Sequence, residues 1–416
     1  MKKYDLIVVG GGLTGVAAAV SAARQGLSVL IADQGGSFGG AMTNCLVYPF
    51  MRFHTTVGEE KKYLSAGLFA EMCQRQDAYR HNFDERRFQP EYFKVALDDM
   101  IEEAGVEVLF HATLFEVIKE DRQIRYLRFA VKSGIFEAAA DYFVDATGDG
   151  DLFTFAGCAY QLGREEDSLC QPMTTCFRVG GVDEKKRLEE RPAMQALYKK
   201  MREDGKFTNP REDILYFTGL GDGIVHFNTT RVVKHDPTDP FSVSKAEMLA
   251  RKQICEMMTF LRENTEAYKD AFLVSGAASI GVRESRMLRG EHVLTADELI
   301  ACTKFPDAIA LGNYDIDIHN PEGAGTSHRY FEPGEYYSIP YRCLLPKEFD
   351  NLLVGGRCIS TTHEAQASIR IMPICATLGE AAGTAIGIAK KTGTNTHTVD
   401  IGQVQALLRK NGAAID

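Results

Sequence analysis

The chain has 416 residues, of which 45% are hydrophobic and 25% are charged, as is typical of a folded globular protein rather than a disordered or fibrous one. The formal net charge of -10 argues against nucleic acid or an anionic membrane as the main partner, because both need a concentrated basic face. The apolar run after Lys2 and Lys3 is too short for a signal peptide, and no stretch approaches the ~20 apolar residues of a membrane span. We therefore expect a cytoplasmic protein without a membrane partner.

The ten cysteines are scattered, and no two of them form a C-x-x-C pair. The closest two, Cys170 and Cys176, are six residues apart. Zinc ribbons and common iron–sulfur clusters use tighter groupings. The pattern predicts buried, reduced thiols and no metal site.

The first thirty residues read as one βαβ unit. A short apolar run at 6–9 ends in glycines, as a buried parallel strand does. Small and apolar residues at 13–25 predict a helix closed by Gly26, and a second buried strand at 27–32 ends at Asp33.

Helices and a meander are predicted next. Residues 59–82 have an irregular amphipathic helical pattern, and Pro90 begins a helix that Gly105 ends. The runs 106–118, 124–131 and 135–144 predict three antiparallel strands.

The middle of the chain has a different texture. Charged helical stretches at 183–204 and 244–270 flank a strand-like piece at 223–229, which indicates a separate α+β unit. Residues 305–342 are rich in Gly, Pro, Asp, His and Tyr with little periodicity, and a loop of that length favours a functional role. A strand at 351–354 and a small-residue helix at 376–390 return to the first pattern.

The predicted fold class is therefore α/β. It consists of an FAD/NAD(P)-binding Rossmann-type domain, with a central parallel sheet and a β-meander, and an inserted α+β substrate-binding cap. We assign residues 1–160, 275–290 and 345–416 to the first domain. The cap would comprise residues 161–274 and 291–344.

A glycine motif between the first strand and helix carries the cofactor prediction. In this G-x-G-x-x-G, Gly10 would make the tight turn, Gly12 would let a pyrophosphate approach the backbone, and Gly15 would let helix and strand pack closely. The helix N-terminus offers free N–H groups to phosphates, and Asp33 can accept from ribose hydroxyls. The alternative is a glycine-rich turn in a nucleotide-free α/β protein. The motif also contains Leu13 and Thr14.

Later glycine turns favour FAD over a nicotinamide dinucleotide. Residues 35–41, 145–151 and 351–357 each bring backbone toward a cofactor that extends beyond its adenosine half. The last helix can point its N-terminus at the flavin edge where negative charge builds on reduction. No second G-x-G-x-x-G follows a strand, so no tightly bound NAD(P)H domain is expected.

Here the sequence resembles the FAD-dependent oxidoreductase family of the glutathione-reductase-like superfamily. The motifs that carry this resemblance run in order from end to end: the N-terminal fingerprint, Asp145–Asp151, Gly281–Arg286, Ile316–His319, Gly356–Ser360, His363–Ala365, Ile369–Pro373 and Gly379–Gly383. The resemblance implies FAD contacts along these glycine turns and near the start of the last helix. The predicted cofactor-binding residues are Gly10, Gly12, Leu13, Thr14, Gly15, Asp33, Gly40, Ala41, Leu114, Ala146, Thr147, Gly148, Gly356, Arg357, Met372 and Pro373.

Three residues are candidates for catalysis. Arg283 would clamp a carboxylate or polarise a carbonyl, unless it belongs to a surface ion network. His319 would transfer a proton, or else make structural hydrogen bonds. His363 follows the Gly356 turn and would be a proton shuttle, a flavin contact or a covalent attachment point. Three tyrosines would line the pocket or simply pack: Tyr336, Tyr337 and Tyr341.

The function expected from these features is FAD-dependent hydride transfer between a small organic substrate and flavin N5. It would take the form of dehydrogenation, C–OH oxidation or alkene reduction. The alternatives are a non-redox flavoenzyme, such as a mutase or isomerase, and a flavin-binding electron-transfer subunit. The second electron partner and any homo-oligomer remain open.

Overall fold

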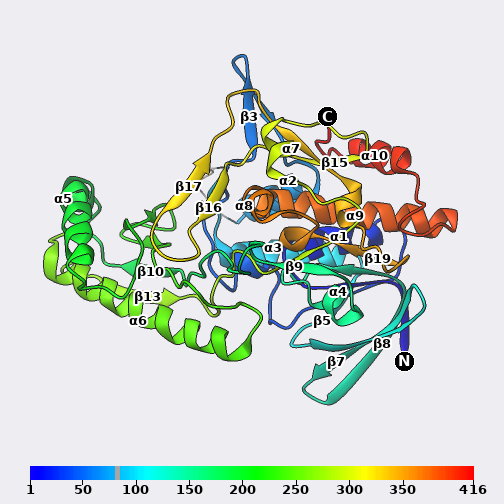
Figure 1. Ribbon diagram of the computed structural model, residues 1–416, viewed down its shortest axis with the longest axis horizontal. Coiled ribbons are helices and arrows are strands. Elements are labelled where there is room, and N and C mark those ends of the chain that lie inside the picture. The colour runs from blue at the N-terminus through cyan, green and yellow to red at the C-terminus, as the bar shows by residue number, and fades with distance from the viewer. Residues whose placement is uncertain (80–84) are drawn as a thin grey trace.

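A seven-stranded sheet forms the centre of the computed structural model, which describes residues 1–79 and 85–416 (Figure 1). A parallel part is followed by the antiparallel meander β8–β7–β6, and the last strand of the chain joins β8 in parallel. Strand β8 serves both parts, because residues 134–139 pair with the meander and residues 138–145 pair with β1. In spatial order the strands are β5 (Glu107–Leu109), β2 (Val29–Ala32), β1 (Lys2–Val9), β8 (Gly134–Asp145), β7 (Gln123–Val131) and β6 (Thr113–Glu120), with β19 (Leu352–Val354) on β8.

Alternation along the strands divides the core into two layers. Leu6 and Val8 face a cluster that contains the main helices, whereas Ile7 and Val9 face a second cluster under the meander. Both sides of the parallel strands are thus buried, which explains their continuous apolar runs. The helices of the first layer are α1 (Leu13–Ala23), α2 (Leu68–Asp77), α3 (Pro90–Glu103), α9 (Met372–Thr392) and α10 (Ile401–Lys410), and α4 (Asp151–Ala156) belongs to the second.

Helices α1 and α9 run in parallel at unusually close range. A Cβ on Gly379 would lie 2.0 Å from the carbonyl oxygen of Thr14, and one on Gly383 would lie 2.2 Å from that of Ala18. Only glycine allows this approach. Within the described residues α9 is also the one helix long and apolar enough to cross a membrane, but 94% of its most apolar window is buried inside the protein.

A smaller α+β unit lies to one side of the central sheet, shown in green in Figure 1. We call it the cap. Its antiparallel sheet packs one face against two long helices to form a separate hydrophobic cluster. In spatial order the strands are β11 (Tyr216–Phe217), β12 (Val225–Phe227), β10 (Phe177–Gly180) and β13 (Phe272–Gly276), and the helices are α5 (Glu184–Glu203) and α6 (Pro240–Asn264).

The segment 305–342, predicted to have little regular structure, contains four short strands. This prediction was wrong because each strand is only four or five residues long, too short to show a period. The pairs are β15 (Ala308–Gly312) with β18 (Tyr337–Pro340) and β16 (Ile316–His319) with β17 (Thr326–Arg329). Leu294, Ile309 and Ile339 pack into the cluster that contains α1 and α9. The domain boundaries remain a prediction.

Two further sequence expectations need correction. The range 59–82, expected to be one helix, begins with the second strand of a hairpin, formed by β3 (His54–Val57) and β4 (Glu60–Tyr63), and the helix α2 starts only at Leu68. Residues 80–82 lie outside the described residues. The run 106–118 is two strands, because the chain turns at His111, where φ is +53°. Strand β5 extends the parallel sheet, and only β6 joins the meander.

The remaining elements connect these layers. Strand β9 (Tyr160–Leu162) pairs with β14 (Arg286–Leu288). This pairing brings the chain that follows α4 beside the chain that returns from the cap. Short helices complete the structure: η1 (Gly40–Met42), α7 (Ala296–Ile300), η2 (Tyr341–Leu344), η3 (Gly356–Cys358) and α8 (His363–Ile369).

Candidate active site

The first glycine turn has the shape of a phosphate-binding loop. Gly10 has φ +104°, and a Cβ there would lie 2.3 Å from the carbonyl oxygen of Ala146, while a Cβ on Gly15 would lie 1.8 Å from the carbonyl oxygen of Gly10. Gly12 differs, because its φ is −67° and no atom lies within 4 Å of an added Cβ. Gly12 is also the N-cap of α1 and provides no side-chain hydrogen bond to the helix. The turn itself requires Gly10 and Gly15, whereas open space lies over Gly12.

Asp33 holds the next segment against this turn. Its carboxylate accepts hydrogen bonds from the backbone N–H groups of Gly11 at 2.5 Å and Gly35 at 2.6 Å. The second glycine loop then crosses the first, since the Gly39 N–H donates to the Gly11 carbonyl and a Cβ on Gly40 would lie 3.0 Å from Gly12 Cα. The carboxylate stands where ribose hydroxyls bind in this type of fold.

A third turn follows β8 and is organised by a buried carboxylate. Asp145 accepts from the Thr147 backbone N–H at 3.0 Å, the Thr147 hydroxyl at 2.7 Å and the Phe153 N–H at 2.9 Å. Burial raises the pKa of Asp145 in spite of these bonds. The turn carries Asp149, which pairs with Arg357 at 2.5 Å and so ties it to the last glycine turn.

The parallel packing of α1 and α9 places two helix N-termini side by side. The Thr14 hydroxyl, in the first turn of α1, donates to the Cys375 carbonyl in the first turn of α9 at 2.9 Å. No side chain caps the N-terminus of either helix, so backbone N–H groups at both N-termini remain to bind a ligand. Met372 and Pro373 are the first two residues of α9.

The predicted cofactor residues therefore fall mainly on converging turns. Leu13 and Thr14 begin α1, Ala41 lies in η1, and Ala146 to Gly148 follow β8. Leu114 is a buried core residue of β6. It lies two residues after Ala112, whose backbone N–H donates to the Asp33 carbonyl. The two helix N-termini, the open Gly12 and the Asp33 carboxylate fit an extended dinucleotide. Which of the predicted residues touch it remains a prediction.

Two buried glutamines link the three candidate catalytic residues into one hydrogen-bond network. Gln366 donates to the Arg283 carbonyl at 2.9 Å and accepts from the side chain of Gln171 at 3.2 Å. The side-chain oxygen of Gln171 accepts from the backbone N–H of His319 at 3.3 Å. The segments around Arg283 and His319 are thereby joined to α8.

His363 and Glu284 form the other end of this network. The Nδ1 atom of His363 lies 2.6 Å from Oε1 of the fully buried Glu284, whose other oxygen accepts from the Gln171 backbone N–H. Burial alone would lower the pKa of His363, but the hydrogen bond and charge of Glu284 outweigh it and raise that pKa. Among the described residues, none forms a hydrogen bond with Nε2 of His363. This is the geometry of an oriented proton-transfer group.

Both ring nitrogens of His319 are engaged. Because an arginine only donates, Arg231 at 3.0 Å makes Nδ1 the acceptor and leaves the proton on Nε2, which lies 3.4 Å from Asp317. Burial and the charge of Arg283 lower the pKa of His319 well below its usual value. The imidazole is neutral and positioned between an arginine and a carboxylate.

Asp317 in turn anchors Arg370 and Tyr314. Tyr314 donates to it at 2.8 Å, and Arg370 lies 3.7 Å from the same carboxylate. Burial would raise the pKa of Asp317, but His319 and Arg370 outweigh this and hold it well below its usual range. Asp317, Arg370 and Arg231 were not among the predicted site residues. The alternation of Asp317 and His319 in one strand was the signal that could have linked those two.

The predicted pocket tyrosines have other partners. Tyr337 shares a hydrogen bond with Ser368 at 2.6 Å, Tyr341 donates to the Thr396 carbonyl, and Lys62 donates to Tyr336. Tyr337 and Tyr341 are also buried in the cluster that contains α1 and α9, so the structure favours core packing for these two.

Comparison with known protein families assigns the chain. The family model described as "FAD dependent oxidoreductase" matches residues 5–408. The chain belongs to this family. Membership makes the protein an FAD-dependent oxidoreductase and confirms FAD as its cofactor.

Solved structures to which this chain is similar include a reductase-like protein, a halogenase and a brominase. A geranylgeranyl bacteriochlorophyll reductase-like protein from Thermoplasma acidophilum has a TM-score of 0.46 at 12% identity, over 99% of this chain and 85% of that chain. The myxobacterial chondrochloren halogenase CndH has a TM-score of 0.46 at 12% identity, over 99% and 79%. The flavin-dependent brominase Bmp2 has a TM-score of 0.48 at 13% identity, over 98% and 83%. Among curated proteins, none matches this sequence significantly.

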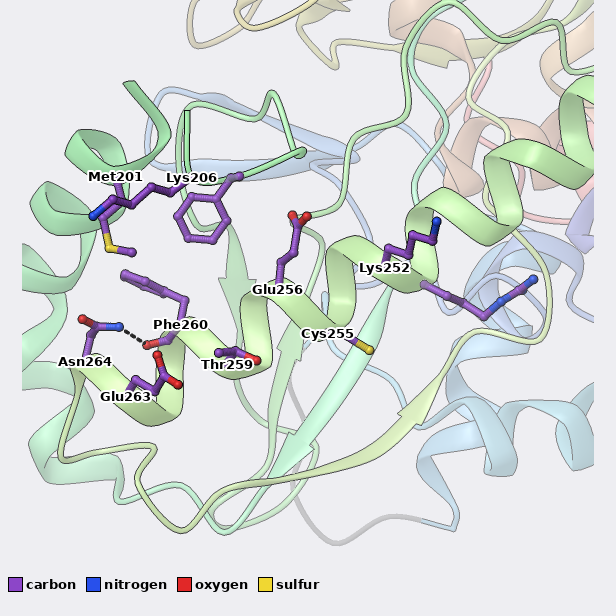
Figure 2. Close-up of a pocket in the computed structure, with 11 residues that line it drawn as sticks. Met201, Lys206, Lys252, Cys255, Glu256, Thr259, Phe260, Glu263 and Asn264 are labelled. Carbon is purple, nitrogen blue, oxygen red and sulfur yellow. Dashed lines mark hydrogen bonds between the residues drawn. The ribbon is translucent and has the colours of Figure 1, made fainter. Parts of the chain in front are cut away.

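A groove on the cap of the oxidoreductase is separate from the glycine turns. It has a volume of about 560 Å³ and lies along α6, close to the end of α5 (Figure 2). Figure 2 shows Glu256, Thr259 and Phe260 of α6 among the residues that line it. None of the predicted site residues lines the groove.

Proposed function

We propose that the oxidoreductase transfers a hydride between flavin N5 and a small organic substrate held between the glycine turns and the cap. The observation that supports this most is the buried network joining Arg283, His319 and His363 from three distant segments. A network of this kind places a cation, a neutral imidazole and an oriented proton-transfer group within one region. Alkene reduction, dehydrogenation and C–OH oxidation each couple the hydride to a proton transfer, and such a network can provide the proton-transfer group.

Bound FAD would supply the two-electron chemistry, held by the glycine turns and by the N–H groups of α1 and α9. The protein must then bind the substrate and move one proton. Arg283 is the cation for binding, because its guanidinium donates to the Pro172 carbonyl and the Thr174 hydroxyl and has no carboxylate partner among the described residues. His363 is the group for the proton, since Glu284 orients its ring and leaves Nε2 for a substrate atom or a water.

The alternative functions differ in what they require of these residues. A flavin-binding electron-transfer subunit would need no oriented proton-transfer group, whereas His363 is buried and hydrogen-bonded to the fully buried Glu284. A mutase or isomerase would use the same residues but would leave no net change in flavin oxidation state. Product analysis separates this last case.

The test is an anaerobic screen of the purified, FAD-loaded protein against small alcohols, saturated acids and α,β-unsaturated acids. Loss of flavin absorbance identifies a substrate for oxidation, and reoxidation of photoreduced flavin identifies one for reduction. With a substrate in hand, His363→Asn should slow the flavin reaction by about 100-fold, within the usual range for general acid–base catalysis. The control His235→Asn, on the cap beside Ser242, should react normally. Equal rates for the wild type and His363→Asn would refute this role.

A further inference from the structure

The cap sheet has one apolar face and one polar face. Phe177, Val179, Val225 and Phe227 alternate along β10 and β12 and pack against the cap helices in a single cluster. The residues between them must point the other way. The polar face therefore carries Arg178 and His226, which stand directly opposite each other in the β10–β12 ladder.

His226 and the buried nitrogens of the half-buried Arg178 have no hydrogen-bond partners. His226 is completely buried, and neither of its ring nitrogens has a partner; nor do Nε and one terminal nitrogen of Arg178. The ring of Tyr48 packs 5.3 Å from that of His226, so an aromatic wall adjoins the pair. Burial and the charge of Arg178 lower the pKa of His226 to about 3, which keeps the imidazole neutral with one N–H to donate. Unmade hydrogen bonds of this kind are costly unless a ligand completes them.

The same side of the cap sheet carries Arg283. Its guanidinium donates to the hydroxyl of Thr174, just before β10, and lies 3.5 Å from the side-chain oxygen of Asn228, just after β12. The charges of Arg283 and Arg178 both act on the thiol of Cys176, whose pKa burial nevertheless raises to about 12. The two arginines thus flank the short stretch of chain that leads into β10.

Positive charge exceeds negative charge around this stretch. Three arginines nearby have carboxylate partners: Arg211 with Asp213 at 2.9 Å, Arg231 with Glu212 at 3.2 Å and Arg370 with Asp317 at 3.7 Å. Among the described residues, Arg178 and Arg283 form no ion pair, and Glu91 acts on Arg178 only from a distance. Burial, then the charges of Arg370, Arg211 and Arg231, lowers the pKa of Arg283 to about 9. A buried, unpaired cation is strongly destabilising unless an anion joins it.

We propose that the substrate of this oxidoreductase is a carboxylate-bearing organic anion, bound on the polar face of the cap sheet by Arg178, His226 and Arg283. The proposal rests on the proposed function and specifies its substrate class. A carboxylate accepts two or more hydrogen bonds from guanidinium groups in one plane, and it neutralises the charge left over at this face. Arg283 links the bound anion to the network of His319 and His363.

The experiment measures anion binding to the FAD-loaded protein with oxidised flavin, so that no turnover is needed. Succinate and benzoate are titrated by calorimetry and by flavin difference absorbance, with succinamide and benzamide as neutral counterparts. The carboxylates should bind at least tenfold more tightly than the amides. Arg178→Gln and Arg283→Gln should each weaken the tighter carboxylate by about tenfold or more. Arg128→Gln is the matched control, because Arg128 is paired with Glu116 and Glu137 on the meander.

Each outcome decides between the proposals. Amides that bind as tightly as the acids, or binding unchanged in both variants, would overturn the anion site even if the protein oxidises another substrate. If the two arginines only stabilised the negative charge of reduced flavin, the protein with oxidised flavin would bind no carboxylate. That result would also overturn the proposal. Carboxylate binding without any flavin reaction would instead contradict the proposed function and leave the anion site standing. Arg178→Gln keeps the test valid should Arg283→Gln fail to fold, because the apolar face of the cap sheet is untouched.

Discussion

Replacing Gly12 by alanine should separate folding from cofactor binding. An added Cβ meets no atom within 4 Å, and φ at this position is −67°, a value that alanine adopts freely. The apoprotein should therefore keep its stability within about 1 kcal/mol, since only a helix N-cap preference is changed. The methyl group would, however, occupy the space through which a pyrophosphate approaches the N-terminus of α1. Overpacking of about 1–3 kcal/mol corresponds to a loss in FAD affinity of about 5- to 150-fold.

The assay is titration of the apoprotein with FAD, followed by quenching of flavin fluorescence, together with thermal unfolding of the apoprotein. Gly15→Ala is the contrasting variant, because its Cβ would lie 1.8 Å from the Gly10 carbonyl and should damage folding and binding together. A Gly12→Ala protein that binds FAD like the wild type would refute the placement of the cofactor. Unfolding of the Gly12→Ala apoprotein would refute the claim that this glycine is required only for the ligand.

Three further predictions concern the buried helices and the His363 pair. Burial raises the pKa of Glu380 to about 7, although the carboxylate accepts a hydrogen bond from the Leu68 N–H. Glu380 therefore favours folding below its unfolded pKa near 4.5, and this contribution is lost as the pH rises through 7. The free energy of unfolding of Glu380→Gln, measured in urea, should therefore rise relative to that of the wild type by up to about 3 kcal/mol between pH 4.5 and pH 8. If the difference between the two proteins did not change with pH, the N-terminus of α2 would already stabilise the carboxylate. Gly383→Ala should cost about 1–3 kcal/mol of stability and weaken FAD binding, because its methyl group would push α9 away from α1. The control Gly276→Ala should do neither, since its Cβ would lie 3.8 Å from the nearest atom. Equal melting temperatures for the two variants would contradict the close packing of α1 and α9. Glu284→Gln should lower the pKa of His363 below its ordinary value, since burial then dominates, and histidine NMR titration would contradict the pairing if that pKa stayed raised.

Local sequence rules predicted much of the cofactor domain. The βαβ unit, the α3 helix and the meander follow from apolar runs bounded by glycine and proline, which are strong local signals. The strands in 305–342 were missed because pairs of four or five residues depend on tertiary contacts rather than on a period. The break at His111 was missed because a positive φ at a non-glycine residue leaves no mark in the sequence.

The candidate site was predictable in part. Glycine spacing marked the turns, and the unusual polar runs around Arg283, His319 and His363 marked three segments of one network. Gln171, Gln366 and Arg231 could not be found, because a buried polar residue gains its role from partners more than fifty residues away in the chain. Arg178 and His226 were hidden for the same reason, since their pairing depends on the register of two strands.

The visible absorption spectrum of the purified protein, before and after acid precipitation, is the most direct test of FAD binding. The protein should show flavin bands near ~370 and ~450 nm, and acid should release its FAD into the supernatant. Colour retained in the pellet would instead make His363 the first candidate for covalent attachment. A colourless protein that also fails to take up added FAD would refute the cofactor site formed by the glycine turns and the paired N-termini of α1 and α9.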